Sequence, residues 1–341
     1  MKSFDWKKTK TVFAVLLYLS LFFFSDTVRK AAAEAINNCL TSLLPTVFPV
    51  MILSSWITAL IMDGEKKRRK RSIAGLIFLA VTGGYLIGSV LACDLYRNGS
   101  LNKKDAAKTA LYNIHPGIGF TVAYVGIGLC GSVFTGIVLY VSVTLGNLFT
   151  RLILGAYIKT NIKTSVSADK AKGSEERQAA PLIKAVNVSI NAAAKMCGWI
   201  LLFAAITAPL KKAPGLSFLP LVLEVTAGVK QSIESLSLPL CAFVLGFGGI
   251  CLYLQLLEFM RILGVSFPFY FLVRTVSGAL SSLIVFLFSS CYPAVIPVFS
   301  VARSSIRPTV GSHAATAGLL LLCTSLMLSS IKNRSLTDGN G

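Results

Sequence analysis

Hydrophobic residues are concentrated along the chain in blocks long enough to cross a bilayer. The blocks cover 11–24, 35–62, 73–93, 117–148, 182–210, 237–257, 267–290 and 314–331. A membrane-spanning helix needs about 17–25 mainly apolar residues, because its backbone must form its own hydrogen bonds in lipid. The sequence has no series of alternating strands of the kind that builds a membrane β-barrel. The pattern therefore predicts an all-α polytopic membrane protein with about eight apolar segments.

Glycine-rich interruptions divide these blocks into two similar series. Residues 35–60 align without gaps to 185–210, and at a constant offset of 165 Gly83, Gly84 and Gly99 align with Gly248, Gly249 and Gly264. A helix, a broken segment and another long helix follow in this order in both halves, which predicts two inverted repeats of the kind typical of secondary transporters. The glycines indicate either close helix packing or glycine-broken, re-entrant helices that line a polar cavity. Two interruptions at matching positions favour the second interpretation.

The same features divide the chain into five parts. We expect an N-terminal transmembrane helix at 1–29, a first half at 30–158 and a polar cytoplasmic linker at 159–178. A second half at 179–290 and a C-terminal transmembrane helix with its tail at 291–341 complete the chain.

The positive charges lie mainly in short runs between the apolar blocks, such as Lys66–Arg71 in a chain of net charge +19. With both termini in the cytoplasm, the connections inside carry 20 Lys and Arg and those outside carry 11. This orientation follows the positive-inside rule and places 93–116 outside and 258–266 inside. Basic loops of this kind have anionic lipid as their usual neighbour, so we expect no nucleic acid partner.

Composition narrows the functional classes further. Hydrophobic residues make up 54% of the chain, charged residues 14%, and the mean hydropathy is +0.72. The eight cysteines form no CxxC pattern, so neither a disulfide scaffold nor a metal site is expected. Motifs for ATP binding, metalloprotease or serine hydrolase chemistry do not occur, so the chain is predicted to be no enzyme and to need no cofactor.

Polar residues inside or beside the apolar blocks are the candidates for solute binding, because a buried polar group in a membrane is costly without a function. His115 could act as a proton relay or could cap a helix that begins at Pro116, and Glu224 could be functional or solvated. Lys195 and Arg274 together would make a basic cavity suited to an anionic solute. The full set is Gly83, Gly84, Gly88, Asn113, His115, Asn187, Asn191, Lys195, Glu224, Thr226, Gly248, Gly249, Gln255 and Arg274. Of these, Asn187, Asn191 and Lys195 share one helical face.

Four stretches resemble the YlbJ-type sporulation integral membrane proteins, which carry the nucleoside-recognition or Gate domain. They are Gly84–Ala106 (GYLIGSVLACDLYRNGSLNKKDA), Asn113–Gly131 (NIHPGIGFTVAYVGIGLCG), Leu223–Gly228 (LEVTAG) and Leu245–Gln255 (LGFGGICLYLQ). The resemblance covers about residues 30–290. Leu86 stands where the family usually has proline, and Ser89 and Val90 stand where it has an Ala-Lys pair, so a charge-based role of that lysine is not carried over.

The resemblance implies a permease in the bacterial cell membrane, or in the membrane around the forespore, that moves dipicolinic acid during endospore formation. Dipicolinate is a small aromatic dianion, for which Lys195, Arg274 and helix N-termini would be suitable partners. The alternatives are a non-transporting membrane scaffold for assembly of the spore envelope or cortex, and a nucleoside-type permease. Energy coupling through Asp94, His115 or Glu224 is left open, as is association with a second copy or with other sporulation membrane proteins.

Overall fold

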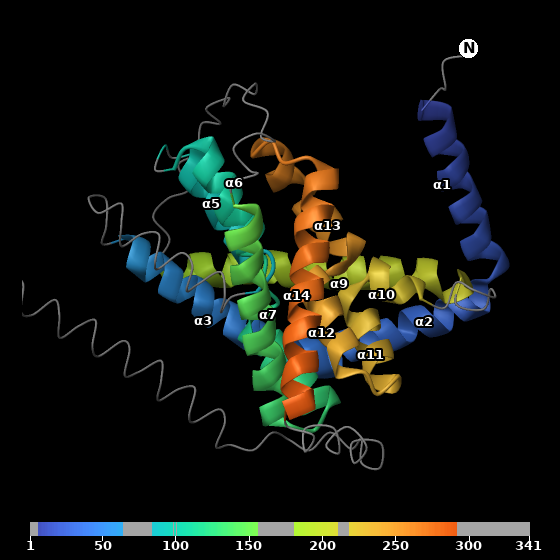
Figure 1. Cartoon of the computed structure of the whole chain (residues 1–341). Coiled ribbons are helices and arrows are strands. Elements are labelled where there is room, and N and C mark those ends of the chain that lie inside the picture. Colours follow the sequence, from blue (N-terminus) through green and yellow to red (C-terminus); the bar gives the residue numbers. More distant parts are fainter. Residues whose placement is uncertain are drawn as a thin grey trace, which may run out of the picture. The chain divides into compact units, whose positions relative to one another are not determined.

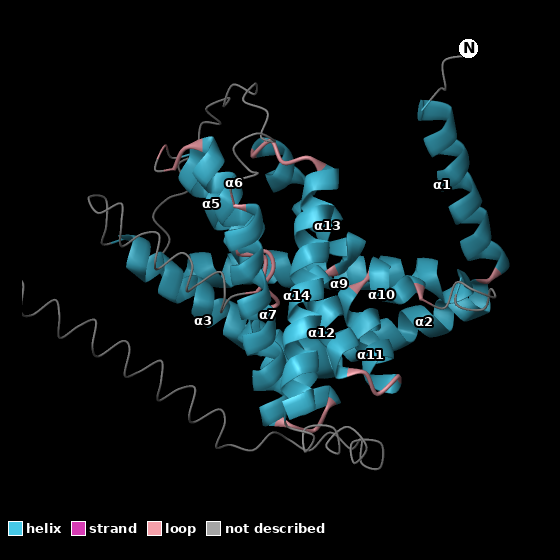
Figure 2. Ribbon diagram, in the orientation of Figure 1, coloured by secondary structure: helices cyan, strands magenta, loops and turns pink. Residues whose placement is uncertain are grey.

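The computed structural model describes residues 6–63, 84–97, 99, 101–155, 181–210 and 218–291. Of these residues 88% are helical and none forms a strand (Figure 2). Within these ranges five helical stretches are long and apolar enough to cross a membrane: Ser25–Ile57, Val133–Leu154, Ala185–Leu210, Leu238–Ile262 and Phe267–Cys291. The predicted helical class is confirmed, and several apolar helices of spanning length indicate a membrane protein.

From residue 25 to residue 63 the chain is continuously helical. After α1 (Trp6–Phe23), the chain runs through α2 (Ser25–Asn38), a π-helical segment η1 (Cys39–Leu43) and α3 (Leu44–Asp63). The hydroxyl groups of Thr41 and Thr46 donate to carbonyls one turn earlier, at 2.7 Å each, so these apolar segments keep their polar side chains satisfied. Both α2 and α3 pack along the long helix α9 (Pro181–Leu210), which runs beside them in Figure 1.

The rest of the first half is built from shorter helices, α5 (Ile87–Arg97), α6 (Lys103–Tyr112), η2 (Gly119–Leu129) and α7 (Val133–Leu154). Asn102 caps α6 by accepting from the Asp105 amide at 2.8 Å, and Ser132 caps α7 in the same way. The apolar block 117–148 was predicted as one segment, and that prediction is wrong. Gly131 has a φ of +66° and turns the chain between η2 and α7, because glycine adopts the left-handed region without steric cost.

The second half follows with α10 (Leu219–Leu223), α11 (Val225–Glu234), α12 (Leu238–Phe247), α13 (Gly249–Ile262) and α14 (Phe267–Cys291). Ser237 caps α12 through the Leu240 amide at 3.3 Å. Leu236 just before it has a φ of +53°, and among the described residues it is the one non-glycine in the left-handed region. The tight turn between α11 and α12 imposes this unusual conformation.

Small residues let α7, α12 and α14 approach closely. A Cβ added at Gly246 on α12 would lie 2.8 Å from the Gly278 Cα on α14, nearer than real side chains approach. Gly146 on α7 faces Ser281 on α14 in the same way. Close approach through small residues is the usual basis of helix packing in membranes. For these glycines the packing interpretation is therefore correct.

Exposed apolar side chains lie along one face of α7. Phe134, Ile137, Val141, Leu148 and Leu152 are each at least 41% exposed and recur at spacings of three, four and seven residues. A face of this kind on a soluble protein would be an association or aggregation surface, whereas lipid covers it without cost. The exposed apolar face of α7 and the lengths of the apolar helices therefore both indicate a membrane protein.

Helices α5 and α13 run parallel to each other. At the start of the two helices, the Tyr85 ring lies 3.7 Å from a Cβ placed on Gly248. Near their ends, the Cys93 thiol on α5 donates to the Phe259 carbonyl on α13 at 3.8 Å. The loops that follow the two helices therefore lie at the same end of this pair. Loop charge had predicted that 93–116 and 258–266 lie on opposite sides of the membrane, and the structure brings them together instead.

Some predictions fall outside the described residues. These are the C-terminal segment 314–331, most of the segment 73–93 with Gly83, and the linker 159–178.

Candidate functional site

At four places in the described part of the chain a helix begins or is interrupted where the sequence has glycine, proline or a capping acid. The first is Gly84, just before α5, with a φ of +99°, and the second spans 113–116, where Pro116 lacks an amide donor and is followed by Gly117 with a φ of +75°. The third is Glu224, which is extended between α10 and α11, and the fourth is Gly248 with a φ of +82° between α12 and α13. A residue with a side chain rarely adopts these positive φ values, so the sequence dictates where the helices end.

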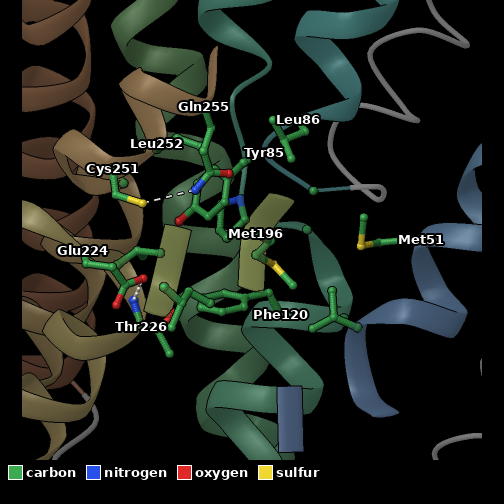
Figure 3. A pocket seen from close by; sticks show the side chains of 18 of the residues that line it. Met51, Tyr85, Leu86, Phe120, Met196, Glu224, Thr226, Cys251, Leu252 and Gln255 are labelled. Carbon is green, nitrogen blue, oxygen red and sulfur yellow. Dashed lines mark hydrogen bonds between the residues drawn. The ribbon is translucent and has the colours of Figure 1, made fainter. Parts of the chain in front are cut away.

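These four places meet at one cavity with a volume of about 60 Å³ (Figure 3). Residues at the starts of α5, η2, α11 and α13 line it, together with apolar side chains of α3 and α9. Figure 3 shows Tyr85, Phe120, Glu224 and Gln255 around this space, with Met196 among them. Pockets that enclose small molecules usually measure about 300–1,000 Å³, so this conformation has room for a few water molecules only.

Backbone contacts hold the interruptions against one another. A Cβ on Gly249 would lie 3.0 Å from the Leu223 carbonyl oxygen and 3.2 Å from the Glu224 amide nitrogen. A Cβ on Gly84 would lie 3.7 Å from the Pro116 carbonyl oxygen. The broken segments of each half therefore cross at their breaks, where no side chain separates the two backbones.

Glu224 is the acid at the cavity. One carboxylate oxygen accepts from the Thr226 amide at 2.8 Å and the other from the Ala227 amide at 2.6 Å, so the side chain caps α11. Burial raises the pKa of this carboxyl group above its ordinary value, while the two amide hydrogen bonds act in the opposite direction. Among the described lining residues there is no Lys, Arg or His.

Arg274 lies behind the cavity wall and joins both halves. Its guanidinium donates to the carbonyls of Gly246 and Phe247 at the end of α12, to the Ile114 carbonyl at 2.8 Å, and to the Asn147 side chain at 3.1 Å. The side chain is completely buried. A cation beside the last carbonyls of a helix is favoured by the helix dipole, so the charge is compensated without a carboxylate.

His115 is held in one tautomer. Its Nδ1 accepts from the Gly117 amide at 3.0 Å, and its Nε2 lies 2.9 Å from the Thr144 hydroxyl, which itself donates to the Tyr140 carbonyl. The hydroxyl hydrogen is thus in use, so Nε2 carries the proton and the ring is neutral. Burial and the nearby charge of Arg274 lower the pKa of His115 to about 3. This geometry favours the structural interpretation, in which His115 ties the second interruption to α7.

Of the residues predicted from sequence, five line the cavity, namely Gly84, Glu224, Thr226, Gly248 and Gln255, and Gly249 lies next to it against the backbone of Leu223 and Glu224. Gln255 donates from its amide nitrogen to the Cys251 sulfur at 3.2 Å. Four more are buried outside the cavity, namely Gly88, Asn113, His115 and Arg274.

The predicted polar face of α9 is not part of this cavity. Asn187, Asn191 and Lys195 are all exposed, while the neighbouring Met196 and Ile200 face the cavity. Lys195 and Arg274 therefore do not form a shared basic site. Within the described ranges no group of three His, Cys, Asp or Glu side chains is placed to hold a metal ion.

Sequence analysis missed two kinds of residue. Tyr85 and Phe120 form the aromatic part of the cavity, and their positions directly after Gly84 and Gly119 were a usable signal. Asn147 and Ser277 complete the network around Arg274, with the Ser277 hydroxyl donating to the Asn147 side chain at 2.5 Å. An asparagine inside the apolar helix α7 was the signal for that network.

Compared with models of known protein families, with curated proteins and with solved structures, the chain has no match. The resemblance to the YlbJ-type proteins therefore stays a prediction.

Proposed function

We propose that this chain is a membrane permease for a small anionic solute. The observation that supports the proposal is the convergence of four helix starts, three of them at interruptions within the described residues, on one cavity among helices of membrane-spanning length. Broken helices are tolerated in a bilayer where they are buried in protein or line a cavity, and transporters use them to form their binding sites. A plain anchor or scaffold needs no such interruptions.

The polar groups at the cavity support an anion as the solute. Four helices begin there, and helix N-termini present unpaired amide hydrogens and a partial positive charge. The N-terminus of α11 is covered by a carboxylate and the Gly117 amide before η2 by the His115 ring, while α13 has no side-chain cap. The resemblance makes dipicolinate the solute to test first.

The two halves are proposed to be inverted repeats, in a different alignment from the offset of 165. In the described residues each half begins with a long helix, α3 or α9, and ends with another, α7 or α14, with shorter helices between them. Left-handed residues recur between the halves at spacings of 131 to 137 residues and pair Gly99 with Leu236, Gly117 with Gly248, and Gly131 with Gly264. In this alignment Gly84 corresponds to the interruption at Glu224.

This arrangement also improves the charge balance of the proposed topology. If the loop after α13 lies inside, the loop between α5 and α6 lies inside as well, because α5 and α13 run parallel. The four Lys and Arg of 97–108 then change sides, and the count becomes 24 inside against 7 outside. The stronger bias is what the positive-inside rule expects.

Uptake of labelled dipicolinate by cells that express the chain alone tests the proposal, with a labelled nucleoside as the competing substrate. We expect saturable uptake of dipicolinate that Gly249→Ala abolishes, because a Cβ at that position forces the crossing apart. Gly198→Ala is the matched control, since nothing lies within 4 Å of a Cβ there. Uptake of the nucleoside alone would support the nucleoside-type permease.

The small volume of the cavity favours the second candidate, a non-transporting membrane scaffold. Uptake of neither substrate by correctly inserted protein would support the scaffold and refute the permease.

A further inference from the structure

Glu224 is the acid at the cavity, and it is built into the crossing of two interrupted helices. Its carboxylate closes the N-terminus of α11, and its own amide lies against Gly249 at the start of α13. The Thr226 hydroxyl adds a further hydrogen bond to the carboxylate. A change in the protonation of Glu224 therefore acts on the break between α10 and α11 and on the break between α12 and α13.

Among the described residues, none forms an ion pair with Glu224. Lys230 on the same helix lies 3.7 Å from Glu34 on α2, with which it forms an ion pair. The groups on the neighbouring elements are all uncharged at neutral pH: Tyr85 before α5, Tyr124 on η2, Cys39 on η1, Cys241 on α12 and Cys251 on α13. The negative charge thus depends on the amides of α11 and on the distant field of Lys230.

Two other groups considered as proton carriers do not fit as well. Both ring nitrogens of His115 are engaged in hydrogen bonds that require the neutral ring. The side chain of Asp94 lies outside the described structure.

We infer that Glu224 binds one proton when an anionic solute enters the cavity, so that transport is proton–anion symport. The inference rests on the proposed function. Two negative charges in one poorly hydrated cavity repel each other strongly, and the repulsion is removed when the carboxylate becomes a carboxylic acid. A protonated oxygen is a weaker acceptor than a carboxylate oxygen, so proton binding weakens one amide hydrogen bond of α11 and makes that amide easier for the solute to engage.

The direction of the pH effect follows from this arrangement. Burial raises the pKa of Glu224 above that of a free glutamate, and the bound anion raises it further. The protonated, solute-accepting form grows as pH falls. Uptake should therefore increase on acidification, by up to about tenfold per pH unit, the limit for one linked proton.

Purified full-length protein in liposomes tests the inference, with labelled dipicolinate as the probe. Uptake is measured at about pH 7.5 and about pH 6.5, with the same pH on both sides of the membrane, and again with an acid-outside gradient. The wild type should take up more at the lower pH and accumulate dipicolinate when the gradient is imposed. In Glu224→Gln the ratio between the two pH values should fall to about one, whatever the absolute rate, while Glu224→Asp should keep the pH dependence. Glu258→Gln, an exposed acid on α13, is the matched control and should behave like the wild type.

The outcomes separate the two proposals. Wild-type uptake that is equal at both pH values, or a Glu224→Gln variant that keeps the wild-type ratio, would overturn the coupling and leave the permease intact. Absence of dipicolinate uptake at every pH would overturn both. Thermal unfolding of each variant shows whether a loss of uptake reflects misfolding. If Glu224→Gln does not fold, the pH ratio of Glu224→Asp is compared with that of the wild type.

Discussion

Replacement of Arg274 by methionine separates a structural role of this residue from a role as a solute ligand. Methionine keeps most of the side-chain volume and removes every donor. The carbonyls of Gly246, Phe247 and Ile114 then lose their partner inside the protein. A buried acceptor without a partner costs about 1–3 kcal/mol, so the three carbonyls together cost at least about 3 kcal/mol. This loss corresponds to a fall of about 6–12 °C in the unfolding midpoint of a protein domain of moderate size.

Thermal unfolding of the detergent-solubilised protein measures this effect, with Lys195→Met as the control. Lys195 is also a cation on an apolar helix, but it is exposed, so its replacement should change the unfolding free energy by about 0.5 kcal/mol or less. Arg274→Lys should lie between the wild type and Arg274→Met, because one ammonium group keeps the charge but cannot reach carbonyls on two segments. An Arg274→Met protein with an unchanged midpoint and a raised KM for uptake would refute the reasoning, since the guanidinium would then serve the solute.

Three further predictions concern the interruptions and their surroundings. Gly249→Ala should lower the unfolding free energy by about 1–3 kcal/mol, because Gly249 has a left-handed φ. Gly198→Ala in the middle of α9 should raise it by up to about 1 kcal/mol, and denaturation curves of the two variants test both values. The imidazole signal of His115 should not shift in NMR spectra between about pH 5 and 8, where a free imidazole titrates, because its pKa is lowered to about 3. Single cysteines at Lys104 and Arg261 should react with an impermeant thiol reagent from the same side of the membrane, and labelling from opposite sides would contradict the parallel packing of α5 and α13.

The sequence predicted the helical class, the long apolar helices and the importance of glycine at the interruptions. Hydrophobic blocks of bilayer-spanning length are rare in soluble proteins, and glycine or proline inside such a block marks a place where a helix can end. It did not predict the division of 117–148, because an apolar turn such as Cys130–Ser132 looks like the helices on either side of it. It also could not separate packing glycines such as Gly246 from chain-breaking ones such as Gly248, since the difference lies in φ and not in hydrophobicity.

The candidate site was predicted less completely than the fold. Glu224 and Thr226 were recognised because a carboxylate in an apolar stretch is costly without a purpose. The basic cavity of Lys195 and Arg274 was not found, because which face of a helix is buried depends on its neighbours. The apolar side of α9 that contains Met196 packs inward, and the polar side remains exposed.

The buried charges of Arg274 and Glu224 have a common origin in the interrupted helices. Each interruption frees carbonyls at the end of one helix and amides at the start of the next, and both must be satisfied in a membrane. Arg274 satisfies the freed carbonyls of α12 and of Ile114, away from the cavity, and Glu224 satisfies the freed amides of α11 at the cavity. Among the helix starts at this mainly apolar cavity, that of α11 is matched with a negative charge and that of α13 has no side-chain cap. A ligand that completes this arrangement must accept hydrogen bonds and carry negative charge, which is why we expect an anion there and a proton on Glu224 when it binds.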